Sequence, residues 1–156
     1  MRWKPVKERF TRLLRQGTSP QQLAWSLTLG LVIGVFPVIG TCNLIITFIA
    51  LRHKLNLALM IAISYLVYPI QIAVFVPFVR LGEVLLGVAH SGLTWEVVKA
   101  SFQQNIWETL LGFSGTLLYA SLGWLVVSLP LGAVLYRISL SLLKARQQKK
   151  TQPRPE

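Results

Sequence analysis

Hydrophobic positions in this chain fall into long runs without one charged residue, and short basic clusters separate the runs. The runs extend from Gln16 to Leu51, from Leu55 to Val79 and from Thr109 to Tyr136. About 20 apolar residues are enough to cross a bilayer, so each run is long enough for a membrane span. Hydrophobic residues make up 53% of the chain and charged residues only 13%, which excludes an ordinary soluble domain. The pattern predicts an all-helical integral membrane protein.

A helix is predicted at the start of the first run. Ser19 and Gln22 have the spacing of a capping box, with Pro20 at the first helical position. Further along, Gly30 and Gly34 form a small-xxx-small pair, which lets another helix backbone approach closely.

The first run is too long for one simple span, and its centre contains helix-breaking residues. The helix should end near Phe36, because Pro37 and Gly40 interrupt it, and a second piece is expected from Thr41 to Leu51. At about 1.5 Å per residue, that piece covers only about half a bilayer. Non-helical backbone at membrane depth is tolerated only inside protein or beside a cavity. The break therefore indicates where a functional site would lie.

The basic residues favour a topology in which this run turns back. If it crossed once, the cluster at 52–54 would face outside, and the two tails would lie on opposite sides. If it is a re-entrant hairpin, the cluster and the tails share one side, and that side holds fourteen of the sixteen basic residues. A complete two-span hairpin gives the same sidedness, but its second limb is short for a crossing. We therefore expect a membrane protein with a re-entrant hairpin, two full spans and both termini cytoplasmic.

The same reading divides the chain into three parts. Residues 1–18 form a basic amphipathic cytoplasmic segment, residues 19–143 form a single membrane domain, and residues 144–156 form a disordered basic cytoplasmic tail. The loop at 80–108 carries an apolar stripe and is expected outside, as a second amphipathic interfacial segment. Anionic lipid headgroups are the partners expected for the basic tails.

Uncharged polar residues gather at two interrupted segments. Thr41 and Asn43 open the second helical piece, whose N-terminal amides favour an anionic group. Tyr68, Pro69 and Gln71 interrupt the next span, and two broken helices facing each other are how many transporters build a site. The alternative is structural, with Asn43 and Gln71 bonding each other or a carbonyl freed by a proline. The predicted substrate-binding residues are Pro37, Gly40, Thr41, Asn43, Tyr68, Pro69, Gln71 and Arg80.

Glycines also recur in the last run, which we expect to form a tight helix interface within the monomer or between protomers. The predicted packing glycines are Gly30, Gly34, Gly112, Gly115 and Gly123.

Residues for catalysis or metal binding are not found together in the sequence. No carboxylate lies inside an apolar run, and neither histidine lies near a candidate nucleophile. His53 and His90 have no cysteine or carboxylate at ligand spacing, and Cys42 is alone. We expect no enzyme activity, cofactor or metal. The net charge of +11 is explained by basic residues that flank spans, so no nucleic-acid partner is expected.

Several short motifs occur in a recognisable order: Ser19-Pro20, Gly30-x-x-x-Gly34-x-Phe36-Pro37-x-x-Gly40, Leu55-Asn56-Leu57, Tyr68-Pro69 and Arg80-Leu81-Gly82. Together they resemble the bacterial domain of unknown function 2062 family. The resemblance covers roughly residues 15–140 and implies a small inner-membrane domain with no settled activity. The family pattern favours Asn-Pro followed by Thr where this chain has Tyr68-Pro69 and Gln71.

Two functions fit these observations. The first is a small transporter or lipid-carrier translocator with its site between the two broken helices. The second is a non-catalytic scaffold or anchor that positions a cell-envelope enzyme, with that enzyme or a homo-oligomer as partner. The sequence names neither a substrate nor a coupling ion.

Overall fold

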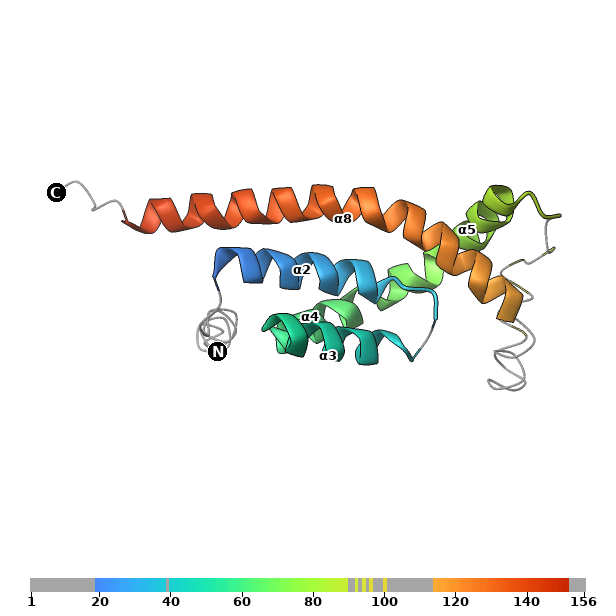
Figure 1. Cartoon of the computed structure of the whole chain (residues 1–156), viewed down its shortest axis with the longest axis horizontal. Helices are drawn as coiled ribbons and strands as arrows, with labels where there is room; N and C mark the ends of the chain where they lie inside the picture. The colour runs from blue at the N-terminus through green and yellow to red at the C-terminus, as the bar shows by residue number, and fades with distance from the viewer. Residues whose placement is uncertain are drawn as a thin grey trace, which may run out of the picture.

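The computed structural model describes residues 19–38, 40–89, 92, 94, 96, 100 and 114–151. Its helices are α2 (Pro20–Gly34), α3 (Cys42–His53), α4 (Leu57–Leu66), α5 (Tyr68–Leu86) and α8 (Ser114–Thr151) (Figure 1). The described residues contain no strand, so the all-helical prediction is confirmed for this part of the chain. Two helices, Tyr68–Leu86 and Ser114–Gln148, are long and apolar enough to cross a membrane. Of the residues expected to form amphipathic interfacial segments, 1–18 lie entirely outside the described ranges, and about half of 80–108 does.

The capping box predicted at the start of α2 is present. The Ser19 hydroxyl accepts a hydrogen bond from the Gln22 amide at 3.2 Å, and the Ser19 amide donates to Gln22 Oε1 at 2.9 Å. Pro20 is the first helical residue, where its missing amide hydrogen costs nothing. Because the start is specified by three local residues, the sequence was sufficient to locate it.

Helices α2 and α3 form a hairpin whose two ends return to the same place. At its open end, Gln22 Nε2 donates to the Lys54 carbonyl at 3.4 Å, and the Asn56 amide donates to Ser26 Oγ at 2.9 Å. Figure 1 shows α2 and α3 side by side, with α8 lying along the other side of α2. The predicted break therefore does reverse the chain.

The second predicted span consists of two helices. The run from Leu55 to Val79 was expected to form a span interrupted at Tyr68 and Pro69, and the structure has an interruption there, because α4 ends at Leu66 and α5 begins at Tyr68. Pro69 lies in the first turn of α5, the only part of a helix where proline removes no backbone hydrogen bond. In Figure 1, α5 leaves the direction of α4 at this point.

The loop expected from residue 80 does not begin there, because the helix continues. α5 continues through Arg80 to Leu86 and stops at Gly87, which has a φ of 63°. Charge alone does not end a helix, whereas a glycine in the left-handed region supplies the usual C-terminal cap.

The last helix also extends beyond its predicted limit. α8 remains helical through Thr151, whereas a disordered tail was expected from residue 144. Residues 137–152 contain neither glycine nor proline and are rich in good helix formers such as Leu, Lys, Arg and Gln, so nothing local ends the helix. Residues 152–156 lie outside the described ranges.

Helix α2 is the centre of the bundle. One side packs on α4, where a Cβ added at Gly30 would lie 3.1 Å from Met60 Cα. The other side packs on α8, where the rings of Trp25 and Tyr136 stack with centroids 4.3 Å apart. The main buried cluster joins α2, α3 and α4 through Ile33, Ile46, Ala50 and Met60, and a second joins α5 to α8 through Phe78, Val79 and Ala120.

Candidate functional site

The chain turns between α2 and α3 because local residues prevent the helix from continuing. α2 ends at Gly34, Pro37 has no amide hydrogen to donate, and Gly40 has a φ of 89°, a conformation that favours glycine. We call residues 36–41 the turn. It lies at the end of the hairpin opposite the contact between Gln22 and Lys54.

Side chains from other helices satisfy the backbone carbonyls that the turn leaves without helical partners. The Val32 carbonyl accepts a hydrogen bond from Trp124 Nε1 on α8 at 2.9 Å. The Phe36 carbonyl accepts one from Gln71 Nε2 on α5. Buried carbonyls without partners are costly, above all where water is excluded. Trp124 and Gln71 therefore stabilise the turn from two other helices.

A residue of the turn itself satisfies a third carbonyl. Thr41 donates its hydroxyl to the Val38 carbonyl at 2.9 Å, and the Cys42 thiol lies 3.9 Å from the same oxygen. The Phe36 ring packs edge-on against Trp124, with ring centroids 4.8 Å apart. The turn is thus fixed by side chains as well as by its own backbone.

The bend between α4 and α5 lies directly beside the turn. A Cβ added at Gly34 would lie 2.6 Å from Val67 Cγ2 and 2.9 Å from Ser64 Cα. Gln71, in the second turn of α5, reaches both the Phe36 carbonyl and Cys42 Sγ, the latter at 3.7 Å. The two interruptions that the sequence predicts to face each other are neighbours in the structure. We call this place the junction.

The N-terminus of α3 opens at the junction without a side-chain cap. Ser19 caps α2 and Asn56 caps α4, but the Thr41 hydroxyl is directed to Val38 and caps nothing. The first turn of α3 contains no acidic residue. Such an end carries about half a positive charge from its amides. Beside it, Asn43 Nδ2 lies 3.3 Å from Tyr65 Oη, and both side chains are exposed.

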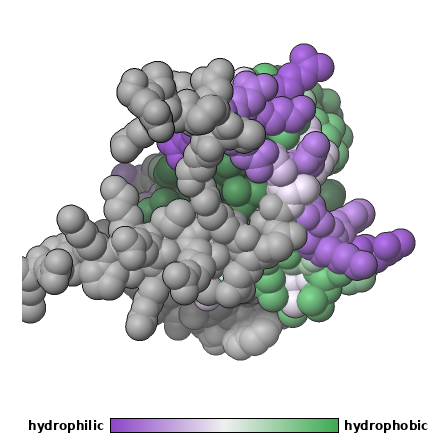
Figure 2. Space-filling model, turned by 90° about the vertical axis from the view of Figure 1, so that its left-hand side faces the viewer, coloured by the Kyte–Doolittle hydropathy of each residue, from purple (hydrophilic) through white to green (hydrophobic). Residues whose placement is uncertain are grey.

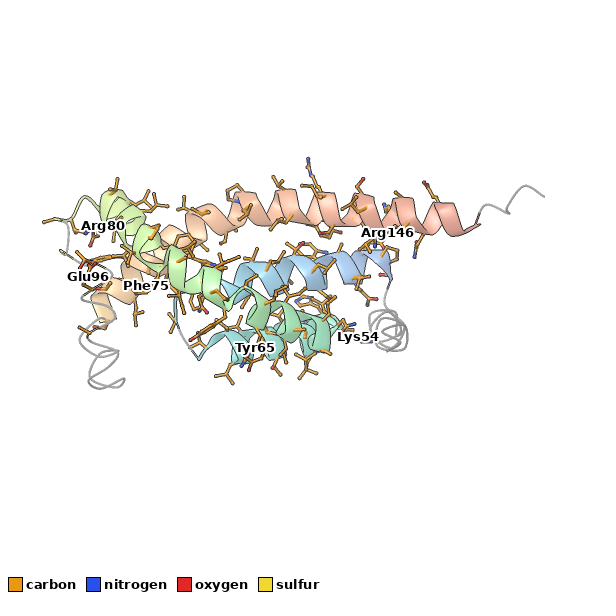
Figure 3. The ribbon with its side chains drawn as sticks, turned by 180° about the vertical axis from the view of Figure 1, so that it is seen from behind. Lys54, Tyr65, Phe75, Arg80, Glu96 and Arg146 are labelled. Atoms are coloured by element: carbon orange, nitrogen blue, oxygen red, sulfur yellow. The ribbon has the colours of Figure 1, made fainter. Side chains whose placement is uncertain are left out.

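The structure places the predicted site residues in three settings. Gln71 is buried and donates to a backbone carbonyl, the kind of partner that the structural alternative named. Asn43 and Tyr68 are exposed at the junction. Arg80 is not brought there: it lies nine residues beyond Gln71 on α5, about 14 Å along the helix, and pairs with Glu83 at 3.1 Å (Figure 3).

Three of the predicted packing glycines lie against neighbouring helices. Gly30 and Gly34 contact α4, and Gly123 lies against the backbone carbonyl of Phe78 where α8 crosses α5. No described residue lies within 4 Å of the place where a Cβ of Gly115 would be, so an interface at Gly115 stays a prediction. Gly112 lies outside the described residues.

Three important residues were missed by the sequence reasoning. Gly82 lies against the Tyr119 backbone at the crossing of α5 and α8. A glycine inside a helix is the sequence signal that could have indicated this close packing. Trp124 was read only as part of an apolar run. Glu83 was assigned to an external loop, yet its side chain is fully buried on α5. The contacts of Gly82 with Tyr119 and of Trp124 with Val32 join segments that are distant in the chain, which a single sequence does not display.

The polar groups at the junction are of kinds that bind ligands. The described residues include no group of three His, Cys, Asp or Glu side chains placed to hold a metal ion. At the junction, the available groups are amide, hydroxyl and thiol side chains together with backbone amides. These groups can bind an anion or a polar headgroup.

Comparison with known proteins identifies a family. The family model described as "Uncharacterized protein conserved in bacteria (DUF2062)" matches residues 3–152. No curated protein and no solved structure matches the chain. Because the match covers nearly the whole sequence, the chain belongs to the DUF2062 family of conserved bacterial proteins.

Proposed function

We propose that this protein is a small bacterial inner-membrane translocator that binds an amphiphile with an anionic headgroup, such as a phosphate-bearing lipid carrier. The observation that carries the proposal is the meeting of two interrupted helical segments at the junction, where the uncapped end of α3 and the exposed Asn43 face outward. Broken helices with exposed termini are a recurring way to build a substrate site inside a membrane. We propose binding and movement of the substrate without catalysis.

Two measures along the helices support a membrane placement. The uncharged part of α8 from Ser114 to Tyr136 is about 33 Å long, close to the roughly 30 Å of a hydrocarbon core. The uncharged segment between Lys54 and Arg80 runs through α4 and α5 and is about 37 Å long, measured along the helices. A segment of this length fits the same core when tilted.

The same measures support a turn that lies within the core and not beyond it. α2 has 15 residues, so it reaches about 22 Å inward from its first residue. Trp124, which contacts both the end of α2 and Phe36, precedes Arg137 by thirteen residues, or about 20 Å. The two values agree and support a re-entrant hairpin that penetrates about two thirds of the core. With fourteen of sixteen basic residues on its open side, both termini would be cytoplasmic.

The contacts divide the predicted site residues by role. Gln71, Pro37 and Gly40 form the wall of the site, because they hold or shape the turn. The α3 amides and Asn43 supply the donors for the headgroup. Exposed apolar side chains on α3, Leu44 and Phe48, offer a path for the hydrocarbon part of the substrate.

The experiment is a translocation assay with the purified full-length protein in phosphatidylcholine vesicles. The probe is a fluorescent polyprenyl monophosphate, and a membrane-impermeant quencher measures its movement between leaflets. Wild-type protein should accelerate this movement, and Asn43→Leu should reduce the acceleration at least tenfold. Leu142→Ala is the matched control, since it changes an exposed residue of α8 that is not part of the junction. Equal rates for Asn43→Leu and wild type would contradict the site assignment.

Topology is tested separately by cysteine labelling in a Cys42→Ser background. Single cysteines at positions 36–41 and 52–54 are treated from each side of oriented vesicles. The proposal expects positions 52–54 to react only from the side of the termini. Labelling of 52–54 from the opposite side would refute the re-entrant hairpin.

One observation favours the scaffold as a second candidate. α8 continues past Arg137 to Thr151, and Lys144 and Arg146 are exposed on this extension. Deletion of residues 144–156 distinguishes the two functions. A scaffold that recruits an envelope enzyme should lose its partner in a pull-down from membranes, whereas translocation in purified vesicles should persist.

A further inference from the structure

Charged side chains of the described residues are divided between the two ends of the bundle. Figure 3 shows Lys54 and Arg146 at one end and Arg80 and Glu96 at the other. We call the first the basic end, and its exposed members are Arg52, Lys54, Arg137, Lys144 and Arg146. Glu83 and Glu96 are the two acidic residues among the described residues, and both lie at the opposite end.

The basic end is composite, because it joins segments more than 80 residues apart in sequence. Gln22 near the start of α2 contacts the Lys54 carbonyl at 3.4 Å. One turn later, Trp25 stacks on Tyr136, the neighbour of Arg137. The two contacts place Lys54 and Arg137 at similar levels on opposite sides of α2. The repulsion among these like charges is reduced by water and is neutralised only by anions.

The side chains around this level change from apolar to basic in the outward direction. Ile138 and Leu142 are exposed apolar residues on α8, while Lys144 and Arg146 lie about 10 and 14 Å beyond Arg137. A headgroup layer is about 5 to 8 Å thick on each side of the hydrocarbon core, so these charges reach through it. Figure 2, which looks onto this end, shows hydrophilic residues in groups next to apolar surface.

We propose that the basic end binds the phosphodiester headgroups of anionic lipids in the leaflet around it, between the end of α3 and the outer part of α8. Charge complementarity carries the assignment: five exposed cations lie at this level or further out, and the apolar side chains beside them suit the acyl region. This surface is separate from the junction, and the proposal stands whether or not the protein translocates a substrate. Each Lys or Arg near such a surface contributes about fivefold in binding.

The test measures lipid preference around the full-length protein in phosphatidylcholine vesicles. Trace spin-labelled phosphatidylglycerol or spin-labelled phosphatidylcholine reports the fraction of each lipid held at the protein surface. Wild type should hold the anionic lipid more strongly, and the preference should fall as KCl is raised from 0.02 to about 0.5 M, where the Debye length is only a few ångströms. The variant Arg52→Gln/Lys54→Gln/Arg137→Gln should lose at least half of this preference.

Controls keep the proposal falsifiable. Arg80→Gln at the opposite end should leave the preference unchanged, since that arginine is already paired with Glu83. Circular dichroism checks that the triple variant, whose substituted side chains are all exposed, keeps its helix content. An unchanged preference in the triple variant, or one insensitive to KCl, would overturn the proposal. Displacement of the anionic lipid by a short DNA duplex at 0.15 M salt would instead assign the basic end to a nucleic acid.

Discussion

Replacement of Gln71 by leucine removes the side-chain donor that holds the turn. Gln71 Nε2 donates to the Phe36 carbonyl and lies 3.7 Å from Cys42 Sγ, and only 5% of the residue is exposed. Leucine is close to glutamine in size, so it should fill the same space without donating. The Phe36 carbonyl would then keep only the weak contact with the Cys42 thiol, whose Sγ lies 3.7 Å away.

The expected loss of stability follows from this one carbonyl. A buried polar group left without a partner costs about 1 to 3 kcal/mol. The apolar leucine offsets part of this, since it removes the need to bury an amide. We therefore expect a loss of about 1 to 2 kcal/mol in the free energy of unfolding, which is about a 5- to 30-fold change in the folded-to-unfolded ratio.

Unfolding by SDS in mixed micelles, followed by tryptophan fluorescence and far-ultraviolet circular dichroism, measures the difference. Asn43→Leu is the matched control, because its side chain is exposed and contacts only the exposed Tyr65 hydroxyl among the described residues. It should change the free energy by less than about 0.5 kcal/mol. Equal stability of Gln71→Leu and wild type would refute the structural role given to this amide.

Further predictions follow from the close contacts and from the turn. Gly82→Ala and Gly123→Ala should each destabilise the protein by at least about 1 to 3 kcal/mol in the same SDS titration, because the new Cβ would meet backbone that is not free to move, whereas Gly115→Ala, with open space, should be neutral or slightly stabilising. Similar losses at all three glycines would contradict the crossing of α5 and α8. Trp124→Phe should cost about 1 to 2 kcal/mol by removing the indole donor to α2, and an unchanged unfolding midpoint would exclude that hydrogen bond. Gly40→Ala should cost about 1 kcal/mol through its positive φ despite the free space around it, and Gly40→Asn should cost less; equal stability of wild type and both variants would contradict the left-handed turn.

The two classes of variant at the junction separate structure from function. Asn43→Leu should fold normally and lose translocation, whereas Gln71→Leu should lose stability first. A variant at Gln71 that loses transport is therefore not evidence for substrate contact by that side chain. Because Gln71 also holds the turn, Asn43→Leu is the variant that tests the substrate site separately from stability.

Local chemistry explains what could be predicted about the elements. Ser19, Pro20 and Gln22 specify the start of α2 through contacts within one turn, so the prediction and the structure agree. Pro37 and Gly40 specify the chain reversal through a missing donor and a positive φ. By contrast, the end of α5 was misplaced, because a charged residue looked like a boundary while the glycine cap at Gly87 decided it.

The sequence by itself determined the helical class, the interrupted first run, the clustering of basic residues and the family. These follow from hydrophobic periodicity, from proline and glycine geometry, and from motifs that occur in order along the chain. Only the tertiary structure decided that the two interrupted segments lie side by side, and which side chains donate hydrogen bonds to the carbonyls at the turn. Trp124 is 92 residues from Val32, and Gln71 is 35 from Phe36. A carbonyl freed by a helix break must find a donor, but its identity depends on how helices distant in sequence cross, and that depends on the whole packed bundle.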